Sequence, residues 1–307
     1  METNEQTQLA WNIIETTNTN LFLTGKAGTG KTTFLRRLKT ESSKRIIVVA
    51  PTGIAAINAE GVTIHSFFQL SFAPFIPDAQ YKTKEQQYRF SKQKIRVIQN
   101  IDTLVIDEIS MVRADLLDAV DSVLRRFRKN QQPFGGVQMV MIGDLGQLAP
   151  VAKDDEWQLL SRYYETPYFF SSLALKRTRY AIVELKTVYR QNDLRFLDIL
   201  NKVRDNCADA SVLQALNSRY IPNFQPRAEE GYIRLTTHNF QAQHVNDHQL
   251  SLLPGQPYTY KAEITGKYPE MLFPTEETLT LKKDAQVMFV KNDSKPAKEY
   301  YNGMIGT

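Results

Sequence analysis

The stretch Gly25-Lys26-Ala27-Gly28-Thr29-Gly30-Lys31-Thr32 decides the fold of this chain. It matches the pattern G-x-x-x-x-G-K-[ST] without a gap or a substitution. An apolar run at residues 21–23 precedes it, and residues 33–38 carry apolar side chains at helical spacing. A strand, a glycine loop and a helix in this order are typical of a phosphate-binding loop, because backbone N–H groups and the positive helix end then face a triphosphate.

The loop also carries the side chains that nucleotide chemistry requires. The Lys31 ammonium would reach the β- and γ-phosphates, and the Thr32 hydroxyl would bind Mg²⁺. The sequence therefore predicts a site for a nucleoside triphosphate with Mg²⁺. The other contacts of this site would come from the neighbouring residues Gly28, Thr29, Gly30 and Thr33.

Length and composition are those of an ordinary globular protein. The chain has 307 residues, enough for about two domains. Its net charge of +5 allows a polyanionic partner but does not require one. The single cysteine, Cys207, excludes a disulfide framework, and no apolar run is long enough to cross a membrane. We therefore expect no membrane contact and a cytoplasmic, nucleoid-associated location in a bacterium, or a nuclear or mitochondrial one in a eukaryote.

Four further apolar runs predict the strands of a sheet. They have no polar alternation, which is typical of parallel strands buried on both faces, and they lie at residues 45–50, 104–106, 137–142 and 181–185. Segments with helical periodicity separate them. The chain is therefore predicted to be α/β, and ligands of such sheets bind at the carboxyl ends of the strands.

Acidic and amide side chains stand at two of these strand ends. Asp107 and Glu108 directly follow the run 104–106. In a nucleoside triphosphatase the first carboxylate completes the Mg²⁺ site and the second takes a proton from the attacking water. Gln147 follows the run 137–142 and is placed to contact the γ-phosphate and report its hydrolysis.

A second group of strand-end residues has two readings. Thr52, Thr63, His65 and Phe67 could hold a sugar-phosphate strand and stack a base. Alternatively, this segment is a loop with a pair of core phenylalanines. Gln6, near the first predicted helix, could likewise read an adenine edge or be a solvated polar residue.

The second half of the chain repeats part of this pattern. Residues 232–237, Tyr-Ile-Arg-Leu-Thr-Thr, predict a strand that ends at Thr237 and is followed by His238, like the end at Thr52. Two such strand ends, one in each domain, would form two binding sites for one nucleic-acid strand. Arg190, after the run 181–185, could stabilise charge on the γ-phosphate.

Taken in order, these pieces resemble the petite-integration-frequency (PIF) family of DNA helicases, in helicase superfamily 1. The resemblance covers nearly the whole chain. Its family-specific part is the segment from Leu116 through Arg125-Arg126-Phe127 to Pro133-Phe134-Gly135-Gly136. The more general helicase motifs are Gly25–Thr33, Ala50 to Ala56, Thr63 to Phe68, Val105 to Met111, Gly143 to Val151 and Leu185 to Gln191.

The resemblance implies two RecA-like P-loop domains with parallel sheets flanked by helices. Residues 1–178 would form the ATP-binding domain 1A, with the insertion 69–97 as the small wedge domain 1B. Residues 179–307 would form a second domain, 2A. We expect domain 2A to be incomplete, because the family's later motifs do not occur before Thr307.

The resemblance also implies roles for individual residues. ATP and Mg²⁺ would be the cofactors, with Lys31, Asp107, Glu108, Gln147 and Arg190 catalytic and Gln6 reading the adenine. Single-stranded DNA would lie along Thr52, Thr63, His65, Phe67, Thr237 and His238. The family further implies 5′-to-3′ movement, forked or quadruplex DNA, a monomer, and work in DNA replication, repair, recombination and telomere maintenance.

One motif departs from the family pattern. The family usually has a phenylalanine near Leu145-Gly146 and a proline where Ala149 stands, whereas Gln147 is retained. Three other functions are alternatives: a RecD-like helicase or exonuclease subunit, an ATP-switched DNA-binding module without unwinding, and a P-loop kinase. The family-specific segment argues against the RecD-like branch, and Glu108 argues against the switch. The stretch Thr63–Phe68, together with Gln147 and Arg190, argues against the kinase.

Overall fold

The computed structural model describes residues 4–77, 90–189, 193–226, 232, 234–264, 275–290, 293, 299–300 and 304–307. The chain forms two compact units, residues 1–213 and 214–307. No helix in the described ranges is both long and apolar enough to cross a membrane.

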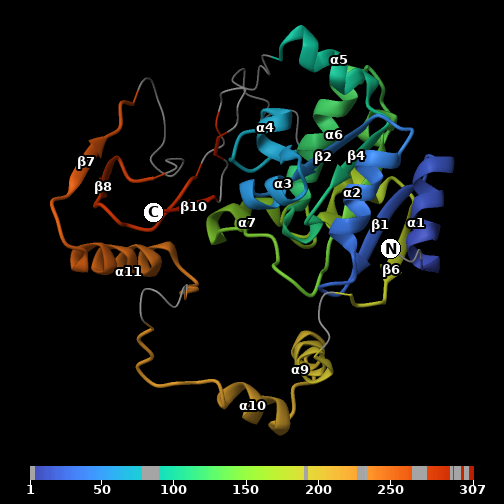
Figure 1. The fold of residues 1–307 in the computed structure, drawn as a ribbon. Coiled ribbons are helices and arrows are strands. Elements are labelled where there is room, and N and C mark those ends of the chain that lie inside the picture. The colour runs from blue at the N-terminus through green and yellow to red at the C-terminus, as the bar shows by residue number, and fades with distance from the viewer. Residues whose placement is uncertain are drawn as a thin grey trace. The chain divides into compact units, whose positions relative to one another are not determined.

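A six-stranded sheet forms the centre of the first unit (Figure 1). Its strands lie in the order β3-β2-β4-β5-β1-β6, and every neighbouring pair is parallel. The carboxyl ends of all six strands therefore lie at one edge. The strands are β1 Asn20–Gly25, β2 Ile46–Ala50, β3 Val62–Thr63, β4 Thr103–Ile106, β5 Gln138–Ile142 and β6 Tyr180–Leu185.

Helices cover both faces of this sheet (Figure 1). In β5, Met139 and Met141 pack with α4, α5, α6 and α8, whereas Val140 and Ile142 pack with α1 and α2. This alternation explains why the strand is apolar at every position. The helices that precede β6 in the chain are α1 Glu5–Thr16, α2 Lys31–Glu41, α3 Gly53–Asn58, α4 Ile64–Phe68, α5 Lys92–Asn100, α6 Ala114–Arg128, α7 Asp154–Leu160 and α8 Leu173–Lys176. Two helices that do not belong to these core clusters, α9 Leu194–Arg204 and α10 Ala210–Asn217, follow β6.

The predicted α/β class is confirmed, and the structure adds detail at two predicted boundaries. Strand β6, which was assigned to the second domain beginning at residue 179, pairs with β1 in the first unit. Of the predicted insertion 69–97, residues 78–89 lie outside the described residues. Residues 92–97 belong to α5, whose Ile98 is fully buried in the main core. The division into domains 1A, 1B and 2A stays a prediction.

The second unit contains helix α11, Asn239–Leu252, and two antiparallel strand pairs. Strand β7 Tyr258–Lys261 pairs with β8 Thr278–Leu281, and β9 Val287–Met288 pairs with β10 Ile305–Gly306. The prediction of a strand at residues 232–237 is wrong for the part of this segment that the structure describes, residues 232 and 234–237, none of which lies in a strand. Leu235 is 88% exposed, and no described strand pairs with this segment.

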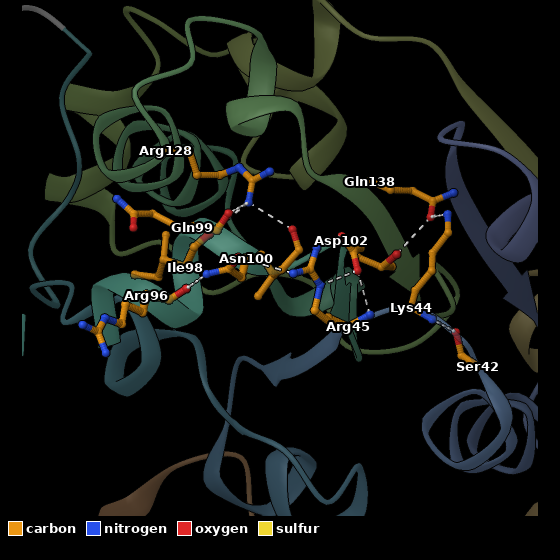
Figure 2. A network of polar contacts seen from close by, with 12 residues as sticks. Ser42, Lys44, Arg45, Arg96, Ile98, Gln99, Asn100, Asp102, Arg128 and Gln138 are labelled. Carbon is orange, nitrogen blue, oxygen red and sulfur yellow. Dashed lines mark hydrogen bonds and ion pairs between the residues drawn. The ribbon is translucent and has the colours of Figure 1, made fainter. Parts of the chain in front are cut away.

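Polar side chains join the strands at the amino-terminal edge of the main sheet (Figure 2). Arg45, before β2, donates to Asp102, before β4, from Nη2 at 2.6 Å and from its backbone N–H at 2.9 Å. Lys44 donates to Gln138 of β5 at 2.9 Å. These contacts fix strand ends on the edge opposite the predicted site, so their role is structural.

Arg128, the last residue of α6, contacts the end of α5 (Figure 2) and the turn at residues 133–136. Its Nη1 donates to the carbonyl oxygens of Ile98, Gln99 and Ile101 at 2.9–3.0 Å, and its Nε donates to Gly135 at 2.8 Å. One guanidinium thus satisfies four carbonyls that the helix end and the turn leave without partners. This explains an arginine within the family-specific segment.

Replacing Arg128 by methionine should lower the free energy of unfolding by about 2 to 3 kcal/mol, because four carbonyls lose a charged donor. Urea denaturation followed by circular dichroism measures this change. The matched control is Arg96→Met on the exposed side of α5, which should change stability by less than about 0.5 kcal/mol. Equal stability of the two variants would contradict this role for Arg128.

Candidate nucleotide site and nucleic-acid interface

The predicted site residues of the first unit follow the carboxyl ends of its strands. Lys31 follows β1, Thr52 follows β2, and Thr63 ends β3. Asp107 follows β4, and Gln147 lies in the turn after β5. The parallel sheet therefore brings these segments to one edge, as the sequence predicted.

The phosphate loop has the backbone conformation of an anion cradle. Gly28 and Gly30 have φ angles of 79° and 91°, which side chains other than glycine adopt rarely. Thr29 is buried, and its hydroxyl donates to the Lys26 carbonyl at 2.8 Å. Lys31 Nζ donates to the carbonyl of Gly25 at 2.6 Å. Burial lowers the pKa of Lys31, and the facing acidic residues oppose this effect.

Close packing between β1 and β6 holds the start of this loop. Gly25 pairs with Leu185 and has a φ of 149°. A Cβ at Gly25 would lie 2.6 Å from the Leu185 carbonyl oxygen and 2.8 Å from the Thr29 hydroxyl. Glycine is therefore required here by the neighbouring backbone as well as by its own conformation.

Two carboxylates follow β4 in different environments. Asp107 is buried, and burial together with the neighbouring Glu108 charge raises its pKa to about 6, although Lys31 acts in the opposite direction. Glu108 is half-buried and has a left-handed backbone, with φ 51° and ψ 45°. Such strain in a residue other than glycine is concentrated at functional sites.

Thr32 and Asp107 suit a magnesium ion bound with a nucleotide. Both offer oxygen atoms, which are the ligands that Mg²⁺ prefers. Within the described residues no group of three His, Cys, Asp or Glu side chains could form a metal cage. A nucleotide-bound Mg²⁺ needs none, because phosphates and water supply most of its ligands. The raised pKa of Asp107 marks a buried carboxyl group that a nearby cation would keep ionised.

Asp144, in the turn after β5, organises the predicted γ-phosphate sensor. It is 1% exposed and accepts hydrogen bonds from the Gly146 backbone at 3.0 Å and from Gln147 Nε2 at 3.1 Å. Arg204 Nη2 donates to the same carboxylate at 2.7 Å. Burial alone would raise the pKa of Asp144, but these hydrogen bonds hold it below its usual value. Gln147 is therefore held by a buried anion.

The segment after β6 returns to the phosphate loop. The Tyr189 backbone N–H donates to the Gly28 carbonyl at 2.8 Å. Asn4 Nδ2, at the start of α1, donates to the Tyr189 hydroxyl at 3.3 Å. Arg190 lies outside the described residues, so its predicted role stays a prediction. Gln6 lies half-buried in the first turn of α1, and its adenine role also stays a prediction.

The predicted nucleic-acid contacts of the first unit begin two short helices. Thr52 and Thr63 cap α3 and α4, and each hydroxyl oxygen accepts a backbone N–H, from Ala55 at 3.2 Å and from Ser66 at 3.3 Å. Because each oxygen accepts this bond, its own hydrogen remains available for a phosphate oxygen. A helix N-terminus also favours an anion. The caps therefore do not conflict with the predicted role.

The aromatic side chains near these two helix caps are not exposed and buried as predicted. Phe67 is 5% exposed and packs in the core, so its ring does not lie where a base could stack. This agrees with the alternative interpretation, in which the segment carries a pair of core phenylalanines. The surface ring is instead Phe72, which is 60% exposed and stacks on His65 with ring centroids 4.5 Å apart. Burial, together with the charge of Arg113, lowers the pKa of His65 and favours its neutral form.

The predicted contacts of the second unit lie at the start of α11. Thr237 is exposed, and its hydroxyl lies 2.8 Å from His238 Nδ1. His238 occupies the N-cap position of α11. Their role in binding DNA stays a prediction.

Sequence reasoning did not single out Asp144, Arg204 or Phe72. Asp144 could have been noticed because it stands between a buried strand and Gln147. Arg204 gave no signal, since a basic residue in the last turn of a helix usually pairs with the helix dipole. Phe72 lies in an aromatic and proline-rich segment, and this pattern indicates only that the segment belongs to an insertion.

Comparison with known proteins agrees with this geometry. The model of the PIF1-like helicase family matches residues 1–211. The ATP-dependent DNA helicase PIF1 of Saccharomyces cerevisiae (strain YJM789) is 36% identical over 89% of this chain. The ATP-dependent DNA helicase Pif1 of Psychrobacter sp. (strain PRwf-1) is 34% identical over 94% of it. The chain spans only 32% and 44%, respectively, of the length of these two relatives.

Solved structures resemble the chain along its full length. In the structure described as DNA unwinding at forked double-stranded DNA by two coordinating Pif1 helicases, the matching chain has a TM-score of 0.88 and 41% identity, and 71% of it is covered. Bacteroides Pif1 helicase in complex with ADP-AlF3 and single-stranded DNA has a TM-score of 0.86 and 40% identity, and 69% of it is covered. Both comparisons cover 100% of this chain.

The fold and the site define a P-loop nucleotide-binding protein of the α/β class. Within that class, the chain belongs to the PIF1-like helicase family. The sequence resemblance to this family is thereby confirmed.

Replacing Gly25 by alanine should lower the free energy of unfolding by at least about 2 kcal/mol, because the added Cβ meets the Leu185 carbonyl in a strained conformation. Chemical denaturation measures this loss. Ala27→Ser adds an atom at an exposed position of the same loop and should stay within about 0.5 kcal/mol of the unchanged protein. A Gly25→Ala protein as stable as this control would show that β6 does not constrain the loop.

Proposed function

We propose that this chain is the ATP-driven motor of a DNA helicase. The observation that carries the proposal is the meeting of three kinds of group at one sheet edge. Lys31 lies in the phosphate loop, Asp107 and Glu108 follow β4, and Gln147 is held by Asp144 after β5. A phosphate-binding cation, a metal-binding carboxylate with a base, and a sensor are the parts that ATP hydrolysis needs.

Each residue has a definite task in this proposal. Lys31, which donates to two loop carbonyls, would exchange them for the more strongly accepting phosphate oxygens. Thr32 and Asp107 would hold Mg²⁺, which neutralises charge on the phosphates when bound. Glu108 would accept the proton of the attacking water, and its half-buried position keeps it near solvent.

Two further tasks complete the ATPase. Gln147 would contact the γ-phosphate, and its turn would then change when the phosphate leaves. Arg190 would stabilise charge on the γ-phosphoryl group, since its neighbour Tyr189 contacts the phosphate loop. Gln6 would read the adenine edge from the first turn of α1.

The proposed substrate is single-stranded DNA. The Bacteroides relative binds single-stranded DNA together with ADP-AlF3, and this chain is 40% identical to it. Thr52 and Thr63 offer hydroxyl hydrogens at helix N-termini, and the His65–Phe72 pair offers a face for stacking. Thr237 and His238 would form a second contact with the DNA strand. Binding should depend mainly on phosphates, so it should weaken with salt and show little base preference.

Finer properties are proposed on the family resemblance alone. They are 5′-to-3′ movement, unwinding of forked or quadruplex DNA, work as a monomer, and a place with DNA in the bacterial cytoplasm or in the nucleus or mitochondrion. One similar solved structure is described as DNA unwinding at forked double-stranded DNA by two coordinating Pif1 helicases, which supports a forked substrate. A working pair is therefore an alternative to the monomer. The insertion 69–97 would serve as the wedge between separating strands.

Replacing Glu108 by glutamine should lower the rate of ATP hydrolysis by about 100-fold or more, because the amide cannot accept the proton of water. Binding of ATP should persist, since the phosphate loop is unchanged. A phosphate-release assay and a fluorescent ATP analogue measure the two properties. Glu60→Gln, at an exposed carboxylate paired with Lys39, is the control and should hydrolyse ATP normally. A normal rate in Glu108→Gln would refute the assignment of the base.

Replacing Phe72 by alanine should weaken binding of an oligothymidine by about 1 to 3 kcal/mol, the loss expected for one stacked base. Fluorescence anisotropy at constant salt measures this. Phe170→Ala is a matched control, because Phe170 is also partly exposed and stacks on a neighbouring ring, Tyr168. Equal affinities of the two variants would remove Phe72 from the DNA surface and leave the ATPase proposal untouched.

A further inference from the structure

Arg204, the last residue of α9, reaches two segments of the nucleotide site. Its Nη2 donates to Asp144 Oδ1 at 2.7 Å, in the turn after β5. Its Nη1 donates to the neighbouring Asp205 at 3.1 Å, and Asp205 pairs with Lys26 of the phosphate loop at 3.2 Å. The end of one helix is thus joined by ion pairs to the segments that follow β1 and β5.

The Asp144 carboxylate divides its contacts between its two oxygens. Oδ1 accepts from Arg204 Nη2 and from the Gly146 backbone, whereas Oδ2 accepts from Gln147 Nε2 at 3.1 Å. Arg204 Nε lies 3.4 Å from Oδ2. A guanidinium that contacts both oxygens fixes the plane of the carboxylate, and that plane determines where the Gln147 amide lies.

Gly146 makes room for this arginine. A Cβ at Gly146 would lie 2.7 Å from Arg204 Nε and 3.0 Å from Arg204 Cγ. The glycine does not have a positive φ, so its backbone alone does not demand glycine. The close approach of the Arg204 side chain is therefore what a larger residue at this position would disturb.

We propose that Arg204 is a positioning residue for ATP hydrolysis, which acts by holding Asp144 and through it the Gln147 amide. The proposal rests on the proposed ATPase function. Arg204 contacts Asp144 but needs no contact with the nucleotide. Its loss should therefore slow the hydrolytic step and spare nucleotide binding, since Gln147 would sample several orientations around the same phosphate loop.

The Arg204→Gln variant tests this in steady-state ATP hydrolysis with single-stranded DNA present. The kcat should fall about tenfold or more, because a displaced group far from the reacting atoms can cost this much. The KM for ATP should stay close to that of the unchanged protein. Because the buried Asp144 loses its charged partner, the melting temperature should fall, so the rates are compared at a temperature at which circular dichroism shows both proteins folded. Arg204→Lys should recover part of the kcat, since an ammonium can reach one Asp144 oxygen but cannot bridge both.

Two other variants make the test specific. Gly146→Ala should reproduce the loss of kcat without a change in charge, because its Cβ displaces the flexible Arg204 side chain. Lys202→Gln is the matched control, since Lys202 lies on the same helix and pairs only with Asp198 and Asp209 in the described structure. It should hydrolyse ATP at the unchanged rate.

The outcomes separate this inference from the proposed function. If the unchanged protein hydrolyses ATP and Arg204→Gln has the kcat of Lys202→Gln, the positioning role is refuted and the ATPase stands. A rise in KM with an unchanged kcat would also refute it, because the lost interaction would then serve binding. If the unchanged protein binds ATP but does not hydrolyse it, the proposed function itself fails.

Discussion

Parallel pairing of all six strands is the constraint on which the site depends. Because β1, β4 and β5 are neighbours and run in one direction, their following segments meet at one edge. Lys31, Asp107 and Asp144 come together only through this pairing. A change of direction in one strand would move its polar residues to the opposite edge, which the contacts of Arg45 and Lys44 already occupy.

Short backbone contacts then fix the segments themselves. The phosphate loop is held on one side by β6, through the close approach of Gly25 to Leu185, and by the bond from Tyr189 to Gly28. Glu108 has a left-handed backbone, and its neighbour Asp107 is buried. A rigid loop beside partly exposed acidic and amide groups suits a reaction in which positioning and charge do most of the work.

The sequence predicted the features that depend on local pattern. Apolar runs located the buried strands, and the glycine spacing located the phosphate loop, because each pattern reflects backbone geometry within a few residues. Contacts between distant segments could not be predicted in this way. Local periodicity does not show that β6 pairs with β1, that Arg204 reaches Asp144, or that Phe67 points inward from a helix of only five residues.

We infer that the two proposed functions of this sheet edge, hydrolysis of ATP and binding of DNA, are coupled. Steady-state ATP hydrolysis by the 307-residue chain, with and without single-stranded DNA, tests this claim most directly. We expect a marked increase in kcat when DNA is added, because the segments proposed to bind ATP and DNA follow strands of one sheet. Equal rates with and without DNA, while ATP and DNA both bind, would contradict it.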